Sequence, residues 1–313
     1  MKYEYKNGKI EMTNFDSFNI GEILECGQCF RFEKISSNLG EVAYSLIAHG
    51  RLLFISQDSG RVCFWYEDGR LLAQEFEELW MPYFDMAQDY SAIKARISQK
   101  DEILRRAIDF APGLRLLRQD PWEIIVSFII SQNNRIPQIQ KVIKNISAAF
   151  GKPIFGGNFA FPSPQELSVA KAEDLRELKA GFRDKYIVDA TAAVLQGEID
   201  TNIHSKLDTD ELRQSLLRIK GIGEKVAHCI LLFGYGRYET FPVDTWVRKI
   251  MEGLYFDGQK TTVADIHALA RRNFGEYSGY ANQYLFHYIR LNPKMIENNS
   301  KTEKIEAKEN TIA

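Results

Sequence analysis

The chain has 313 residues, of which 45% are hydrophobic, 12% aromatic and 26% charged, and this composition is typical of a folded protein and excludes a mainly disordered one. Forty Lys and Arg residues against 42 Asp and Glu give a net charge of −2, so no large positive field indicates a nucleic-acid partner. The charge is mildly polarised, because residues 1–100 carry −4 and residues 101–293 carry +2.

The N-terminal segment, MKYEYKNGKIEM, is too polar for a signal peptide, and the longest apolar run, residues 124–130, is much shorter than a membrane-spanning helix. We therefore expect a cytoplasmic protein that does not bind a membrane. Cys26 and Cys29 form a C-x-x-C pair, but no second pair completes a zinc site and no βαβ pattern flanks it. We expect neither a metal nor another cofactor.

Short apolar runs broken by turn residues predict that the first hundred residues are mainly β. Residues 42–48, 51–56 and 61–67 have this form, with His49-Gly50 at the first break, so we expect an antiparallel meander. Residues 3–12, with Asn7-Gly8 at their centre, predict a further hairpin.

Beyond Asp89 the apolar residues recur three and four positions apart, which predicts helices. The segments with this spacing are residues 90–97, 102–110, 121–130, 139–150, 173–180, 186–195, 211–219, 226–233, 246–254, 263–274 and 282–289. Ser163-Pro164-Gln165-Glu166 has the pattern of a capping box with proline at the first helical position. The fold class is therefore α+β, with an N-terminal antiparallel β-sheet domain packed on a helical body.

We place the boundaries of the β-rich domain at residues 1–110 and those of the helical domain at residues 111–293. Residues 294–313 have no apolar period and are expected to form a disordered tail.

The segment at residues 216–251 carries the strongest chemical signal. Gly221 and Gly223 separate two predicted helices, and a glycine turn at a helix N-terminus presents backbone N–H groups that can bind a phosphate. Such a turn would let a slightly acidic protein hold DNA. The alternative is a helix corner whose glycines only permit close packing.

Two residues near this turn favour chemistry. Lys225 lies in the first turn of the second helix, where the positive end of the helix dipole disfavours a second positive charge and so favours a neutral, nucleophilic amine. Asp244 directly precedes the next helix, where its alternative role is an ordinary N-cap. A candidate amine nucleophile and a carboxylate beside a phosphate-binding turn indicate covalent chemistry on nucleic acid.

Taken together, these segments resemble the helix-hairpin-helix DNA glycosylases, and within them the 8-oxoguanine DNA glycosylases of the eukaryotic type, which some bacteria also possess. The similarity extends to about residue 292, with the hairpin at about residues 211–233. It implies a two-lobed helical body, with Lys225 and Asp244 as the catalytic pair.

Further motifs support the resemblance in the expected order. Residues 27–32, GQCFRF, are similar to the family signature in which the carbonyl of Gly27 would accept a hydrogen bond from N7–H of the damaged base. Asn133 matches the asparagine that fills the gap left by the extruded base. Phe182 and Arg183 match a wedge residue and an arginine that pairs with the orphaned cytosine.

Three residues are expected at the extruded base. Cys229 and Phe286 would cover its two faces, although both also fit an apolar helical face and could be ordinary core residues. Asn282 stands where the family usually has a glutamine that reads the Watson–Crick edge, so its reach differs by one methylene.

Other departures concern the DNA opposite the lesion. Gln138 replaces an arginine that contacts the opposite cytosine, so we expect weaker preference for cytosine. Phe182 replaces a tyrosine, and Trp246 stands where a histidine near the lesion phosphate is common. These changes affect opposite-base selectivity more than catalysis.

The resemblance implies a monomeric, bifunctional DNA glycosylase and AP lyase, acting on double-stranded DNA that contains 8-oxoguanine. For a bacterial member, we expect a nucleoid-associated enzyme in the cytoplasm. The alternatives are a non-catalytic helix-hairpin-helix protein that binds damaged DNA and a glycosylase for another damaged base. Relatives that act on oxidised pyrimidines carry a four-cysteine iron–sulfur loop after the hairpin, and this sequence has no cysteine beyond Cys229.

Overall fold

The computed structural model describes residues 2–36 and 41–295, and the chain forms two compact units. The first unit comprises residues 1–88 and 113–237, and the second comprises residues 89–112 and 238–313. The chain therefore passes from the first unit to the second and back before it enters the second again. This division does not follow the boundary at residue 110, which stays a prediction, and the predicted tail lies outside the described residues from residue 296 onward.

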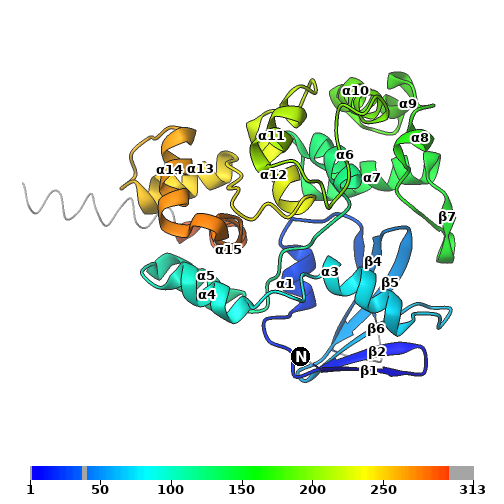
Figure 1. Ribbon diagram of the computed structural model, residues 1–313, viewed down its shortest axis with the longest axis horizontal. Helices are drawn as coiled ribbons and strands as arrows, with labels where there is room; N and C mark the ends of the chain where they lie inside the picture. The colour runs from blue at the N-terminus through cyan, green and yellow to red at the C-terminus, as the bar shows by residue number, and fades with distance from the viewer. Residues whose placement is uncertain (1, 37–40, 296–313) are drawn as a thin grey trace, which may run out of the picture. The chain divides into compact units, whose positions relative to one another are not determined.

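An antiparallel sheet forms the N-terminal part of the first unit, as predicted, and it has six strands, of which β3 was not predicted (Figure 1). Its spatial order is β1-β2-β6-β5-β4-β3. The strands are β1 (Lys2–Lys6), β2 (Lys9–Thr13), β3 (Phe32–Ile35), β4 (Val42–Ala48), β5 (Arg51–Gln57) and β6 (Arg61–Trp65). The predicted hairpin and meander are both confirmed.

Turn chemistry and strand register explain why these strands pair. Asn7 and Gly8 have φ of 51° and 75°, and His49 and Gly50 have φ of 50° and 69°, so each tight turn places two left-handed residues between antiparallel strands. In this register one row of residues runs across the sheet, with one residue each from β2, β6, β5 and β4, and all four are buried. The members of this row are Ile10, Phe64, Ile55 and Tyr44.

Aromatic side chains cover the buried face of the sheet. A continuous helical run of α2 (Ala73–Glu75), the π-helical turn η1 (Phe76–Trp80) and α3 (Met81–Tyr83) supplies Phe76 and Trp80, which are fully buried in the same cluster as the sheet residues. Helix α1 (Ile20–Glu25) adds Ile23 to this cluster. The domain core is therefore built from a sheet face and two helical segments.

The rest of the first unit is helical. Its helices are α6 (Pro121–Ser131), α7 (Ile136–Phe150), α8 (Pro164–Leu167), α9 (Ala172–Glu177), α10 (Asp184–Leu195), α11 (Thr209–Leu217) and α12 (Glu224–Phe233), with η3 (Gly181–Arg183) before α10. A small hairpin of β7 (Pro153–Ile154), η2 (Phe155–Gly157) and β8 (Asn158–Phe159) follows α7. Helix α6 is buried from Pro121 and Trp122 through Ile130 except at Glu123, and it is the central helix of this part.

The second unit contains α4 (Tyr90–Ser98), α5 (Glu102–Phe110), α13 (Thr245–Tyr255), α14 (Val263–Phe274), η4 (Gly275–Tyr277) and α15 (Ser278–Leu291). Tyr280 of α15 lies at its centre, with ring centroids 5.5 Å from Tyr90 and 4.7 Å from Tyr238. The predicted helices are present in both units, and the Ser163–Glu166 capping box is confirmed. None of the helices in the described part of the chain is long and apolar enough to cross a membrane.

Candidate active site and DNA-contacting surface

The turn between α11 and α12 depends on two glycines with different roles. Gly221 has a φ of +93°, and an added Cβ would lie 2.4 Å from the ring of Tyr186, so no other residue fits without a shift. Gly223 is the N-cap of α12, and an added Cβ would meet open space. Because glycine offers no side-chain cap, the first N–H groups of α12 remain available to an anion.

A carboxylate at this helix end is paired with an arginine. Glu224, the first residue of α12, lies 2.7 Å from Nη1 of Arg213, and the same arginine also contacts Asp210. The guanidinium compensates the negative charge of Glu224 next to the exposed amides. Glu224 therefore repels a phosphate that approaches these amides less strongly than it would without Arg213.

Lys225 is half-buried and lies over an aromatic cluster. Its Nζ is 5.4 Å from the ring centroid of Phe128, which stacks on Phe233 at 5.6 Å and contacts the edge of Phe30 at 5.9 Å. Phe30 belongs to the 27–32 motif, Phe128 to α6 and Phe233 to α12. The aromatic cluster below this amine is thus built from three segments that are distant in sequence, and Cys229, which is buried, follows Lys225 one helical turn later.

Gln28 anchors the backbone next to Gly27. Its side chain is fully buried, donates from Nε2 to the carbonyls of Ile23 and Arg115 at 2.9 and 2.8 Å, and accepts from the amide of Leu117 at 2.8 Å. Gly27 itself has a φ of +89°. Gln28, which belongs to the 27–32 motif, therefore holds the backbone next to Gly27 through partners that the motif itself does not indicate.

Gln119 extends this network to α12. Its Nε2 donates to the carbonyl of Gln28 at 2.8 Å, and its backbone amide donates to the carbonyl of Phe233 at 2.9 Å. The 27–32 motif is therefore connected to the last residue of the helix that carries Lys225. The 27–32 motif contains Gln28, but no role was predicted for Gln28 or Gln119, because neither residue belongs to a spacing that indicates its partners.

The predicted opposite-strand residues lie at the ends of helices in the first unit. Asn133 is exposed in the turn after α6 with a φ of +49°, and Gln138 is exposed in the first turn of α7. Phe182 is 56% exposed, whereas Arg183 is only 7% exposed. Arg183 donates hydrogen bonds to the carbonyls of Gln132 and Asn133, so the structure brings together Asn133, Phe182 and Arg183.

In the second unit, Asp244 is the N-cap of α13. Its Oδ1 accepts a hydrogen bond from the amide of Val247 at 2.7 Å, which is the structural role that the sequence left open. Because only one carboxylate oxygen makes this bond, the other can face a ligand. Lys225 belongs to the first unit and Asp244 to the second.

The segment before Asp244 is attached to α14 and α15 through its carbonyls. Asn282 is buried, and its Nδ2 donates to the carbonyl of Pro242 at 2.9 Å. Nε2 of His267 forms a hydrogen bond with the carbonyl of Phe241 at 3.0 Å. Asn282 was expected to read the base, and here its amide helps to hold the backbone that leads to Asp244.

Two further predicted residues of the second unit pair with cations. Trp246 is 42% exposed in the first turn of α13, and Nζ of Lys249 lies 5.6 Å from its ring centroid. Phe286 is half-buried on α15, with the guanidinium of Arg290 5.7 Å from its ring. An aromatic face beside a cation suits contact with DNA bases and phosphates.

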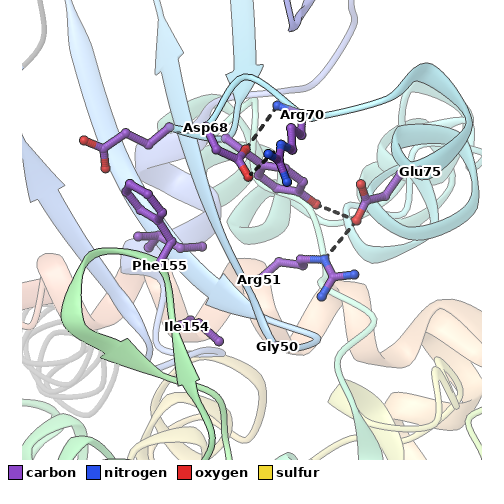
Figure 2. A pocket seen from close by; sticks show the side chains of 10 residues that line it. Gly50, Arg51, Asp68, Arg70, Glu75, Ile154 and Phe155 are labelled. Carbon is purple, nitrogen blue, oxygen red and sulfur yellow. Dashed lines mark hydrogen bonds and ion pairs between the residues drawn. The ribbon is translucent and has the colours of Figure 1, made fainter.

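The pocket in Figure 2 contains none of these residues. It has a volume of 390 Å³ and lies between β5, the segment after β6 and the β7–β8 hairpin. Arg51 pairs with Glu75 at 3.0 Å, and Arg70 lies 3.9 Å from Asp68, so the cations of this pocket are balanced by carboxylates.

The cysteines and acidic residues do not form a metal centre in the described residues, where no group of three or more His, Cys, Asp or Glu side chains could hold a metal ion. Cys26 and Cys29 are buried free thiols that contact the carbonyls of Ile23 and Leu24, and burial raises the pKa of Cys29 well above its usual range. A buried thiol with a raised pKa is unreactive, which fits a packing role.

Two families match the chain in succession. Residues 10–125 match the family described as 8-oxoguanine DNA glycosylase, N-terminal domain. Residues 126–275 match the HhH-GPD superfamily of base excision DNA repair proteins.

Relatives and solved structures agree with these matches. The probable N-glycosylase/DNA lyase of Methanothermobacter thermautotrophicus is 32% identical over 244 residues, which is 71% of this chain and 76% of that protein. The N-glycosylase/DNA lyase OGG1 of Arabidopsis thaliana is 30% identical over 83% of this chain and 74% of that protein. The 8-oxoguanine glycosylase/lyase of Clostridium acetobutylicum, solved with double-stranded DNA containing cytosine opposite 8-oxoG, is 37% identical, with a TM-score of 0.86 over 94% of this chain and 99% of that one.

The fold, the order of the motifs and these relatives lead to one assignment: the chain belongs to the N-glycosylase/DNA lyase family of 8-oxoguanine DNA glycosylases.

Proposed function

We propose that this enzyme extrudes 8-oxoguanine from double-stranded DNA, cleaves its N-glycosidic bond and nicks the strand. Its relatives are named N-glycosylase/DNA lyases, and a similar solved structure is a complex with DNA containing cytosine opposite 8-oxoG, which favours an enzyme over a protein that only binds damage. The observation that carries the proposal is Lys225 in the first turn of α12, directly after an N-terminus without a side-chain cap.

In the proposed mechanism, the neutral amine of Lys225 attacks C1′ of the deoxyribose. The C1′–N9 bond breaks, and the base leaves with the bonding electrons and takes up a proton. Asp244 stabilises the positive charge that develops on the sugar and helps to remove the proton from the attacking amine. The C1′–O4′ bond of the resulting aminal then breaks, and O4′ takes up a proton, which opens the sugar ring and leaves a Schiff base between Lys225 and C1′. This Schiff base acidifies the C2′ proton, whose loss expels the 3′ phosphate by β-elimination.

We assign the remaining predicted residues to two groups. At the damaged base we place the carbonyl of Gly27 and the side chain of Asn282, with Cys229 and Phe286 covering the two faces of the base. Along the DNA we place the hairpin amides of Gly221 and Gly223, together with Asn133, Gln138, Phe182, Arg183 and Trp246. The exposure of Asn133, Gln138 and Phe182 at helix ends in the first unit, and the cation beside Trp246, support the second group.

We further propose that the protein acts as a monomer, in the cytoplasm at the nucleoid if the host is bacterial, and without a cofactor. The boundaries at residues 110 and 293 are proposed as those of the two domains. Each of these statements follows from the sequence and from family resemblance.

The function is tested with duplexes that contain one 8-oxoguanine and an end label. The wild type should release the base and nick the strand, whereas Lys225→Gln should do neither. Lys206→Gln, which removes an exposed lysine outside the hairpin, is the matched control and should keep full activity. If the wild type does not act on 8-oxoguanine but acts on another lesion, 8-oxoguanine is not its substrate and the proposal is wrong on this point.

A further inference from the structure

A cavity of 480 Å³ lies between the sheet, α7 and the β7–β8 hairpin, all within the first unit. Its sheet side is the face that points away from the buried core, because Ile47, Leu52 and Phe54 alternate with the core residues of β4 and β5. Small-molecule sites in proteins have volumes of about 300–1,000 Å³, so this cavity can hold a ligand of ordinary size. None of the catalytic or DNA-contacting residues proposed above is among its described lining residues.

The sheet side of the cavity presents an aromatic ring. Phe54 stacks on Trp65, with ring centroids 5.7 Å apart and an angle of 20° between the rings, so one face of the Phe54 ring is covered. On the other side, the register places Ser45 of β4 next to Phe54, and Ser45 also lines the cavity. Because serine is too small to cover a phenyl ring, the second face of Phe54 offers a stacking surface for a flat ligand.

The α7 side of the cavity contains a buried hydroxyl group. Ser147 is only 2% exposed, yet its Oγ makes no hydrogen bond to any described residue, although a helical serine can bond the carbonyl four positions before it. A buried hydroxyl without a partner lowers stability. Because Ser147 lines the cavity, a ligand bound there can supply the missing partner.

Most of the charged side chains that line the cavity are paired. Arg31 is paired with a buried glutamate, and Nζ of Lys144 lies 2.9 Å from Oε1 of Glu33. Lys141, one turn before Lys144 on α7, is exposed and has no ion-pair partner in the described part of the chain. The same is true of Glu67, in the segment after β6. The Lys144–Glu33 pair is exposed on both sides, so replacing it with another anion costs little.

We propose that this cavity is a second ligand site, apart from the catalytic site, and that it binds a purine nucleoside monophosphate. The base stacks on Phe54, and its N–H groups donate to Glu67. The phosphate binds Lys141 and Lys144, and the hydroxyl of Ser147 donates to a ligand oxygen. A purine is favoured over a pyrimidine because its larger ring covers more of the aromatic surface. An apolar ligand fits less well, since it would leave the hydroxyl and both uncompensated charges without partners.

Isothermal titration calorimetry with AMP and GMP, in a buffer without phosphate, tests the proposal on the full chain. At least one of the two should bind with a Kd below about 1 mM, and guanosine, adenosine and inorganic phosphate should each bind at least about tenfold more weakly. If neither nucleotide binds in this range, the proposal is wrong. Equal affinity for inorganic phosphate alone would also overturn it, because the base would then contribute nothing.

Three substitutions locate the nucleotide. Lys141→Gln removes the unpaired cation, Phe54→Leu removes the flat ring but keeps an apolar side chain, and each should weaken binding by about tenfold. Ser147→Ala should weaken binding without lowering the Tm, because no hydrogen bond within the protein is lost. Lys206→Gln, which removes an exposed lysine elsewhere in the first unit, is the control and should bind as the wild type does. Unchanged binding by both Lys141→Gln and Phe54→Leu would contradict the proposed site.

A purine could also enter the catalytic site, and bound DNA separates the two possibilities. Lys225→Gln protein is titrated with the nucleotide alone and after saturation with an 8-oxoguanine duplex. The two Kd values should agree within about twofold, because the duplex occupies the catalytic site and not the cavity. Loss of nucleotide binding in the presence of the duplex would overturn the proposal. Because no step of this test requires excision, its result does not depend on the proposed function.

Discussion

Gln28 and Lys225 differ in how far their roles could be inferred from the sequence. Lys225 follows a glycine turn at a helix start, a local pattern whose chemistry can be predicted from a few adjacent residues. Gln28 is important because its buried amide bonds Ile23, Arg115 and Leu117, and two of these partners are almost ninety positions away. Such partners are determined by packing and not by sequence spacing, so the motif at residues 27–32 could be recognised but the anchoring role of Gln28 could not be predicted.

Gln138 should limit the preference for cytosine opposite the lesion. It is exposed at the start of α7, and an amide offers a weaker and shorter contact than an arginine. We expect the wild type to prefer cytosine by less than about a hundredfold, or about 2.7 kcal/mol. Gln138→Arg should increase this preference by about 1–3 kcal/mol in single-turnover excision on four duplexes.

The control for this experiment is Gln165→Arg, which adds the same charge on exposed α8. It should change binding to all four duplexes alike. A wild type that already prefers cytosine by more than a hundredfold would show that another residue reads this base.

At the scale of elements, the hairpin between α11 and α12 predicts that its two glycines matter for different properties, Gly221 for stability and Gly223 for DNA binding. Gly221→Ala places a methyl group against Tyr186 in a left-handed backbone and should lower the free energy of unfolding by at least about 2 kcal/mol in urea denaturation. Gly223→Ala meets open space at φ −98° and should change it by less than about 1 kcal/mol. It should nevertheless weaken DNA binding, because a methyl group would lie beside the amides that we propose bind a phosphate. Similar stabilities for the two variants would exclude this account of the turn.

The start of α6 contains a carboxyl group whose titration affects stability. Burial raises the pKa of Glu123 to about 7, with a further increase from Asp120, while Arg31 at 3.5 Å acts in the opposite direction. From about pH 4.5 to 7 the folded protein therefore holds a proton that the unfolded chain has released. The contribution of Glu123 to the free energy of unfolding must then fall as pH rises through this range.

Replacing this carboxyl should reveal the effect. In urea unfolding, the free energy of unfolding of Glu123→Gln should fall between pH 5 and 7.5 by about 1–3 kcal/mol less than that of the wild type. Glu177→Gln, which removes an exposed carboxyl on α9, is the control and should follow the wild type. Parallel curves for all three proteins would mean that Glu123 is already ionised at pH 5.

The elements themselves were largely predictable, since regular apolar periods and Asn-Gly or His-Gly turns depend on local chemistry. Helices α5 and α14 were predicted with the residue limits that the structure shows. The β7–β8 hairpin and the helical run from α2 to α3 were not predicted. Two-residue strands have no period, and the run contains a π-helical turn and Pro82, which disturb the helical spacing.

At the scale of the whole molecule, the order of the chain hides its division into units. Residues 89–112 follow the sheet in sequence but belong with the C-terminal helices. Helix α5 packs with α15 across more than 160 positions, and Tyr255 of α13 donates to Asp101 at 2.9 Å. Sequence periods predict a helix but not its partner, so this arrangement required the structure.

The net charge of −2 predicts how binding responds to salt. Hairpin amides and helix ends displace few counterions, so the slope of log affinity against log salt should correspond to about three to five phosphate contacts. Fluorescence anisotropy from 50 to 300 mM salt, with Lys225→Gln protein and lesion DNA, measures it. A slope equivalent to about ten contacts would reveal a large basic surface instead.

The central claim is that Lys225 forms a covalent bond with the sugar of the damaged nucleotide. Borohydride reduction during reaction with an 8-oxoguanine duplex, followed by peptide mass spectrometry, tests it directly. We predict one protein–DNA adduct, located on Lys225 and absent from Lys225→Gln. An adduct on another residue, or undiminished cross-linking by Lys225→Gln, would contradict the account.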